Sequence, residues 1–420
     1  MRFLLLLAFA PLLLLGGEEY ELPPIHYSDS VPKDPIQDLV KRLKAGQVKV
    51  SRTDAWTLLR DLRKQLGIPD ESQVLVFSKT SKQNERISPR TPRILWFGDE
   101  TYLGYTLGGS IEIASVDPRL GPVFYLLEPD EAPAKPLQFH RDQSCLSCHG
   151  GPFTPGVPGV LVRSVFPGQT GHPILSQGST VVDSTTPFSD RWGGWYVTGK
   201  HGTSTHRGNV TATENPDNTC DMPVEQGANL TSLTALFDTA PYPRPSSDIV
   251  ALMVLEHQTA VQNVLTKAHH TALRAMHMQA SLQKELGEPV QSLPVGTAQR
   301  IIGHGAEDVL DALLFKDEAA LPEGGIEGDE TFQTAFGKNA LRTAEGRSLK
   351  DFQLLTRLFK YRCSYMIHSQ TFAQMQPDLK RAVLSRLDLV LKGEDGSDRY
   401  SYLADSERKH IRKILAETLR

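Results

Sequence analysis

The spacing of apolar residues gives the first part of the chain a short helical pattern. Residues 18–70 begin with a lead-in that contains four prolines and continue with two stretches, 36–43 and 56–66, in which apolar side chains recur at helical spacing. Thr53 is a plausible cap for the second stretch, and Gly67 is a plausible stop. The pattern predicts an extended lead-in followed by two short helices that pack on a larger body.

Between residues 71 and 245 the pattern changes to short runs of β-forming residues separated by turn residues. The clearest runs are 74–77, 94–97, 102–106, 111–113 and 123–127, with weaker ones at 160–165 and 195–198. From 153 to 245 the chain is dense in Gly, Pro, Thr and Ser, and loops this long are unusual unless they are functional or surround a cofactor. We expect a β-rich and loop-rich region here.

From residue 246 to residue 420 the periodicity is helical. Ser246, Ser247 and Asp248 can cap a long helix whose apolar stripe starts at Ile249. Further helices are predicted near 306–314, 349–359, 377–391 and 406–419, and no internal repeat is present. The predicted fold class is α+β, with a β/loop-rich N-terminal half followed by a mainly helical C-terminal half.

Residues 1–17 have the pattern of a secretory signal peptide, with a basic start, the uncharged run 3–15 and two glycines before an acidic pair. The run is shorter than the roughly 20 residues that cross a bilayer. Because Gly-Gly matches the cleavage pattern poorly, an uncleaved membrane anchor is the alternative. Both interpretations predict a periplasmic or otherwise extracytoplasmic protein with no transmembrane span beyond the leader.

Length and charge narrow the class of protein further. A chain of 420 residues suggests two or three domains, and a formal charge of −4 without any Lys/Arg tract argues against a nucleic-acid partner. Of the four cysteines, Cys220 and Cys363 could form a disulfide in an oxidising compartment. They could equally be two unrelated thiols.

The candidate chemistry concentrates in a Cys-x-x-Cys-His sequence at residues 145–149. Two thiols at this spacing can each form a thioether with a porphyrin vinyl group, and His149 can then offer its imidazole to the iron as the proximal ligand. The alternative is a disulfide or half of a zinc site, but a zinc site needs four ligands and no second Cys-x-x-Cys occurs. We therefore predict one covalent haem c attached through Cys145 and Cys148.

The ligand at the second axial position of such a haem would distinguish an electron carrier from an enzyme. Residues 190–209 contain two Trp, a Tyr, two His and five Gly, which suit close approach to a macrocycle and proton transfer. His206, with a slight preference over His201, is the candidate distal ligand, and Met222 is a thioether alternative. The segment could instead be a β-hairpin with core tryptophans and solvated histidines.

Other charged and imidazole side chains are weaker candidates for contact with a haem or a metal. Arg191 and Arg141 could pair with haem propionates, or they could be ordinary surface arginines. His270 and His277 share a face of the predicted long helix, where they could contact a metal, although surface histidines are the more common arrangement.

The motif at residues 145–149 resembles that of the c-type cytochromes. The wider pattern, including Arg-Trp-Gly-Gly-Trp-Tyr-Val-Thr-Gly at 191–199 and Tyr-Arg-Cys-Ser-Tyr at 361–365, is similar to large uncharacterised bacterial cytochrome c domain-containing proteins. The resemblance implies a covalent haem held through two cysteines with the adjacent histidine on the iron. The expected function is an extracytoplasmic monohaem cytochrome that transfers electrons to a redox partner protein. The alternative is a peroxidase-like haem oxidoreductase that acts on a small-molecule substrate in a distal pocket built from residues 190–209.

Overall fold

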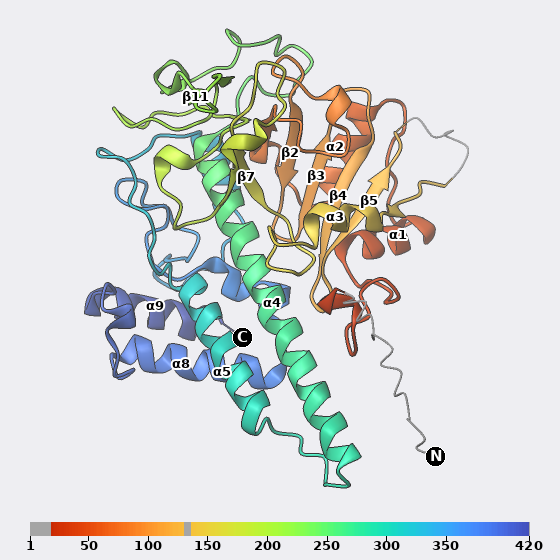
Figure 1. Ribbon diagram of the computed structural model, residues 1–420, viewed down its shortest axis with the longest axis vertical. Helices are drawn as coiled ribbons and strands as arrows, with labels where there is room; N and C mark the ends of the chain where they lie inside the picture. The colour runs from red at the N-terminus through yellow and green to blue at the C-terminus, as the bar shows by residue number, and fades with distance from the viewer. Residues whose placement is uncertain (1–17, 130–135, 420) are drawn as a thin grey trace, which may run out of the picture.

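An antiparallel sheet from the first half of the chain lies against helices from the second half (Figure 1). The structure is a computed structural model that describes residues 18–129 and 136–419. The predicted signal peptide, 1–17, lies outside these residues. The predicted α+β class, with a mainly helical second half, is confirmed.

The sheet has seven strands in the order β6-β5-β4-β3-β2-β1-β9, and each neighbouring pair is antiparallel. The strands are β1 Val74–Val76, β2 Arg93–Phe97, β3 Thr101–Tyr105, β4 Ile111–Asp117, β5 Gly121–Leu127, β6 His140–Arg141 and β9 Trp195–Tyr196. The first five match the predicted β runs and form a meander, as antiparallel strands joined by short turns do. The short strands β6 and β9 therefore lie at opposite edges of the sheet.

Side chains alternate between the two faces of the sheet, and both faces are covered. One face, which includes Leu103 and Ile113, packs with α1 Pro35–Lys44 and α2 Ala55–Leu66. Asp54, not Thr53 as predicted, caps α2, because its carboxylate accepts the Thr57 N–H at 2.9 Å. Gly67 ends α2 in the left-handed conformation, as predicted.

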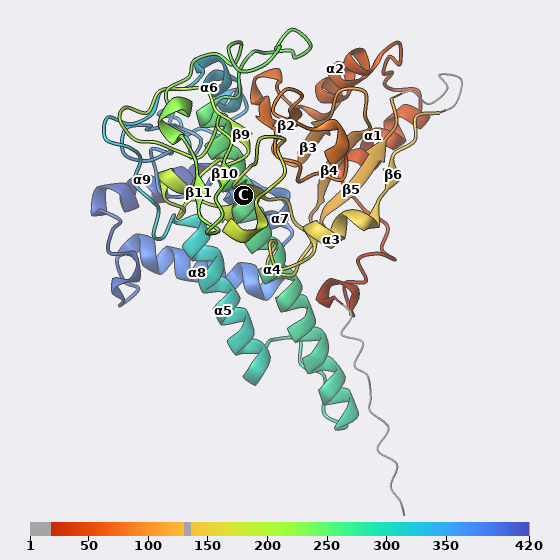
Figure 2. The ribbon, with the colours of Figure 1, turned by 45° about the horizontal axis from the view of Figure 1, so that its top comes forward.

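The other face of the sheet packs against α4, Ile249–Glu285, a helix of 37 residues and about 55 Å in length. Its cap is Asp248, one of the three predicted candidates. The remaining long helices are α5 Gly296–Leu313, α6 Glu330–Gly337, α8 Pro377–Lys392 and α9 Asp405–Thr418. Phe124 on β5, Leu255 on α4 and Leu387 on α8 belong to the same buried cluster. The sheet region and the helical region thus share one core (Figure 2).

The predicted helix at 349–359 is wrong. This segment doubles back so that the rings of Phe352 and Phe359 stack 5.5 Å apart, at 14° between their planes. The side-chain oxygen of Gln353 accepts backbone N–H groups of the turn, including that of Thr356 at 2.8 Å. Tertiary packing of two aromatic rings therefore overrides a local periodicity that favours a helix.

The long region after the motif forms two small hairpins, β7 Val162–Val165 with β8 Ser179–Val182, and β10 Thr213–Glu214 with β11 Cys220–Asp221. Cys220 lies half-buried in the second hairpin, whereas Cys363 is fully buried in the helical core. Both are free thiols, so the suggested disulfide between them is not present.

Candidate haem attachment site

The Cys-x-x-Cys-His sequence occupies a single helical turn. The 3₁₀ turn Gln143–Cys145 continues directly into α3, Leu146–His149, which ends at Gly150. Cys148 and His149 lie three and four residues after Cys145, so their side chains project from the same side of the turn. Cys145 is half-buried, Cys148 is exposed, and both thiols are unpaired. The turn therefore presents two thiols and an imidazole together.

The His149 ring is held in one tautomer. Its Nδ1 lies 2.9 Å from the carbonyl oxygen of Gly159, and because a carbonyl only accepts, Nδ1 must carry the proton. The ring also packs 4.9 Å from Phe124, and burial lowers the pKa of His149 and keeps it neutral at pH 7. Within residues 18–129 and 136–419, Nδ1 is the ring nitrogen of His149 that makes a hydrogen bond, and none engages Nε2. A neutral imidazole with a fixed Nδ1–H and an available Nε2 is the form that binds iron.

The backbone next to the carbonyl that orients His149 is held by α4. The side-chain amide of Asn263 donates to the Val160 carbonyl at 2.8 Å, and a Cβ on Gly159 would lie only 2.4 Å from Asn263 Oδ1. Position 159 therefore requires glycine for this close approach. Sequence reasoning missed Gly159, Phe124 and Asn263, because long-range folding brings these separated positions together and no local signal marks them.

An ion pair lies near the motif. Arg93 on β2 pairs with Glu112 on β4, and both charges act on Cys145 and His149. The Arg93 guanidinium crosses the sheet over Gly104, where any side chain would clash with it. Its Nε is buried and has no partner among the described residues. Burial, with nearby carboxylates, raises the pKa of Cys145 to about 11, so this thiol is protonated at neutral pH.

These features fit a covalently attached haem. Two unpaired thiols and an available imidazole nitrogen lie on one turn, and a guanidinium with an unused N–H could pair with a propionate. Arg93 was not among the sequence candidates. Arg141, which was one, donates to backbone carbonyls of the N-terminal lead-in, including that of Tyr27 at 2.7 Å, and its guanidinium lies 4.7 Å from the Tyr27 ring centroid. Arg141 therefore holds the N-terminal lead-in next to the motif.

The two distal-ligand candidates lie in a buried aromatic cluster. His201 and His206 are each 1% exposed, and their rings are 4.8 Å apart beside Phe188 and Trp192. Both nitrogens of His201 are used, since Nδ1 donates to the Ser204 carbonyl at 2.8 Å and Nε2 accepts from an amide at 3.0 Å. The tryptophans of this segment are core residues, as the alternative interpretation expected, but the histidines are buried rather than solvated.

The structure does not bring this cluster to the motif. Residues 190–209 surround β9, whereas the motif follows β6 at the opposite edge of the sheet. Six strand spacings of about 4.8 Å put the two edges on the order of 29 Å apart along the sheet. Two imidazoles on one metal, each about 2 Å from it, need nitrogens only about 4 Å apart. The strand β11, which directly precedes Met222 in the chain, also lies away from α3 in both views (Figures 1 and 2).

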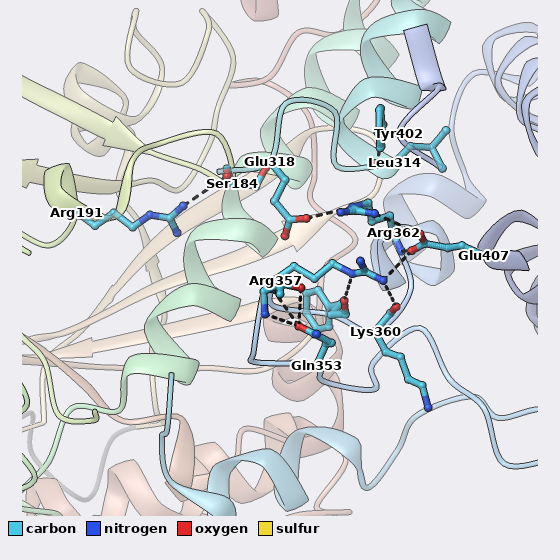
Figure 3. Close-up of polar contacts among 12 residues, drawn as sticks. Ser184, Arg191, Leu314, Glu318, Gln353, Arg357, Lys360, Arg362, Tyr402 and Glu407 are labelled. Carbon is cyan, nitrogen blue, oxygen red and sulfur yellow. Dashed lines mark hydrogen bonds and ion pairs between the residues drawn. The ribbon is translucent and has the colours of Figure 1, made fainter. Parts of the chain in front are cut away.

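Arg191 is buried in a second polar cluster. It forms an ion pair with Glu256 and donates to the Thr186 carbonyl at 2.7 Å and 2.9 Å, and burial raises the pKa of Glu256 to about 7. A cavity of about 10 Å³, lined by Arg191, Glu256 and Glu318 among others, has room for about one water. Figure 3 shows Glu318 pointing to Arg362, which pairs with Glu407. Arg191 therefore links the loop region to the helices and is not beside the motif.

The histidines of α4 are mostly internal. His257, His269 and His270 are buried, and His270 Nε2 donates to the Arg119 carbonyl at 3.0 Å, whereas His277 is exposed. The expectation of surface histidines is therefore wrong for His270 and holds for His277. In the described part of the chain, no group of three or more His, Cys, Asp or Glu side chains is arranged to hold a metal ion.

No family model, no curated protein and no solved structure matches this chain. Among the described helices, none has both the length and the apolar character needed to cross a bilayer.

Proposed function

We propose that this protein is an extracytoplasmic monohaem c-type cytochrome that transfers single electrons. The observation that carries the proposal is the state of His149, whose Nδ1 is hydrogen-bonded to the Gly159 carbonyl, while no hydrogen bond engages Nε2 in the described residues. It stands on the same turn as two unpaired thiols. Export through the predicted leader is part of the proposal.

Each residue of the site has a defined task in this proposal. Cys145 and Cys148 would form the two thioethers, and His149 Nε2 would be the proximal ligand. Gly159 and Phe124 orient the imidazole, while Arg93 would neutralise a propionate. When bound, the haem supplies reversible one-electron exchange at its iron. Because Cys148 is exposed, the attachment point lies at the surface, where a redox partner protein can approach.

The peroxidase-like alternative relied on a distal pocket from residues 190–209, but the candidate distal ligands His201 and His206 are buried at the far edge of the sheet. An absorption spectrum separates the two functions in any case. Low-spin ferric iron that ignores cyanide and carbon monoxide favours transfer, whereas high-spin iron that binds them favours catalysis.

Covalent attachment tests the proposal directly. The full chain, produced in bacteria together with a cytochrome c maturation system, is expected to carry the added mass of one haem that acidified organic solvent does not extract. The double variant Cys145→Ala/Cys148→Ala should lack this mass, whereas the control Cys220→Ala should keep it, since Cys220 lies in a separate hairpin. Wild-type protein without the added mass would show that the proposal is wrong.

A further inference from the structure

The far end of the α4–α5 hairpin carries an unusual concentration of exposed apolar side chains. This end projects beyond the rest of the molecule (Figures 1 and 2). Thirteen large apolar side chains of the described residues are exposed, and six of them lie between positions 278 and 295. They are Met278, Leu282, Leu286, Val290, Leu293 and Val295, and they define the hairpin tip. Apolar residues that gather in this way mark a contact surface rather than chance exposure.

Polar side chains hold the hairpin tip together from inside. The Gln279 side chain donates to the Leu293 carbonyl at 2.9 Å and accepts the Val295 N–H at 2.9 Å. Gln283, which is buried, accepts the Gln291 N–H at 3.0 Å. Gln279 and Gln283 thus form hydrogen bonds within the hairpin, while the aliphatic side chains around them are exposed.

The charges at the hairpin tip are balanced. Met278, Leu282 and Leu286 are spaced by four residues and so follow one face of α4. The exposed charged residues around them, Lys284, Glu285, Glu288 and Arg300, are two cations and two anions. Contact with a lipid headgroup region would therefore depend on burying aliphatic side chains and not on attraction to anionic lipids.

The start of the described chain lies on the same helix. Glu19 forms an ion pair with Arg274, which precedes Leu286 by twelve residues, or about 18 Å along α4. The uncharged run 3–15 is joined to this point by only a few residues. The described chain therefore begins beside α4, about 18 Å from Leu286 of the hairpin tip.

We propose that the hairpin tip docks into the headgroup region of a lipid bilayer and orients the protein on the membrane. The proposal does not depend on the haem, because the hairpin tip contains none of the motif residues. A second copy of the chain is the competing occupant. The six exposed apolar side chains are far fewer than the roughly 20–30 residues that each partner contributes to a stable interface.

Tryptophan fluorescence can test this docking in the full chain, whether or not the leader is cleaved. Leu286→Trp is compared with Leu175→Trp, which replaces a side chain that is 83% exposed elsewhere. Both variants are mixed with phosphatidylcholine vesicles whose acyl chains are brominated. Quenching of Leu286→Trp should exceed that of Leu175→Trp on the order of twofold, and added salt should leave it unchanged. The four native tryptophans contribute the same background to both variants.

Equal quenching of the two variants would overturn the proposal, since the hairpin tip would then not enter the bilayer. Sedimentation without lipid tests the competing occupant. If the protein is a dimer that Leu282→Ser and Leu286→Ser abolish, the hairpin tip is a contact between copies and the proposal is wrong. If the protein is a monomer and both substitutions leave the fold intact, the result supports docking on the membrane.

Discussion

His149, at the end of α3, and His206, in a loop, lie near opposite edges of the same sheet, and their surroundings make them chemically different. His149 has one nitrogen fixed by the Gly159 carbonyl and the other unbonded, next to an exposed thiol. His206 is 1% exposed among Phe188, Trp192 and His201, and burial lowers its pKa to about 3. Nε2 of His206 also has no partner among the described residues, but it is buried, whereas His149 is only partly buried and lies beside the two thiols.

The residues that neighbour a histidine in the sequence are therefore a poor guide to its role. The segment around His206 has the aromatic and glycine content expected of a cofactor pocket, but its rings pack on one another. His149 has Gly150, Gly151 and Pro152 after it, and its orientation depends on Phe124 and Gly159 from other elements. The useful distinction is whether a ring nitrogen remains available near the surface.

Replacing His149 is expected to have the largest effect. In His149→Ala the absorption bands of the bound haem should shift, because the proximal ligand is lost. His206→Asn and Met222→Leu should leave the bands unchanged, since neither side chain is brought to the motif. Spectra of the three purified variants check this. A shift in His206→Asn with none in His149→Ala would reverse the assignment of the two regions.

Breaking the buried ion pair should chiefly affect stability. Glu256→Ala leaves Arg191 charged and unpaired where both side chains are at most 3% exposed, which should cost about 3–5 kcal/mol of unfolding free energy. Urea unfolding of the haem-bound protein, followed by circular dichroism, measures the loss. The double variant Arg191→Met/Glu256→Leu should recover part of it. An unchanged midpoint in Glu256→Ala would contradict the structural role.

His206 should make folding sensitive to acid. Its pKa is about 3 in the folded state and near 6.5 when unfolded, so the unfolded chain binds more protons as the pH falls below 6.5. Its contribution to stability is complete above pH 6.5 and declines toward pH 3. His206→Asn keeps an acceptor for the Gly208 N–H but does not titrate. Between pH 6.5 and pH 4 the variant should therefore lose about 3 kcal/mol less unfolding free energy than the wild type. Parallel pH dependences in variant and wild type would contradict this.

The smallest effect is expected at the surface beside the motif. Lys82 bonds to Asp142 at 2.7 Å and to Ser144 at 2.6 Å, but it is more than half exposed. Lys82→Ala should therefore change the unfolding free energy by less than about 1 kcal/mol and leave haem attachment intact. Loss of covalent haem in this variant would mean that the ion pair positions the attachment turn.

The order of elements was largely predictable from local patterns. The strands of the meander and helices α1, α2, α4, α8 and α9 follow hydrophobic periods that are visible in the sequence. The segment 349–359 was not predictable, because two phenylalanines that suit a helix face stack on each other instead. Within the candidate site, the motif itself was visible, whereas Gly159, Arg93 and Phe124 were not.

The sequence alone determined which residues are the candidates for haem attachment, because one turn of chain contains both thiols and the imidazole, and it determined the α+β order of elements. Only the tertiary structure decided which other side chains surround that turn. The tertiary structure places the 190–209 segment and the motif at opposite edges of the sheet, and it leaves the apolar side chains of the hairpin tip exposed. The physical reason is that contacts between distant residues depend on strand order and helix packing, which no local period encodes.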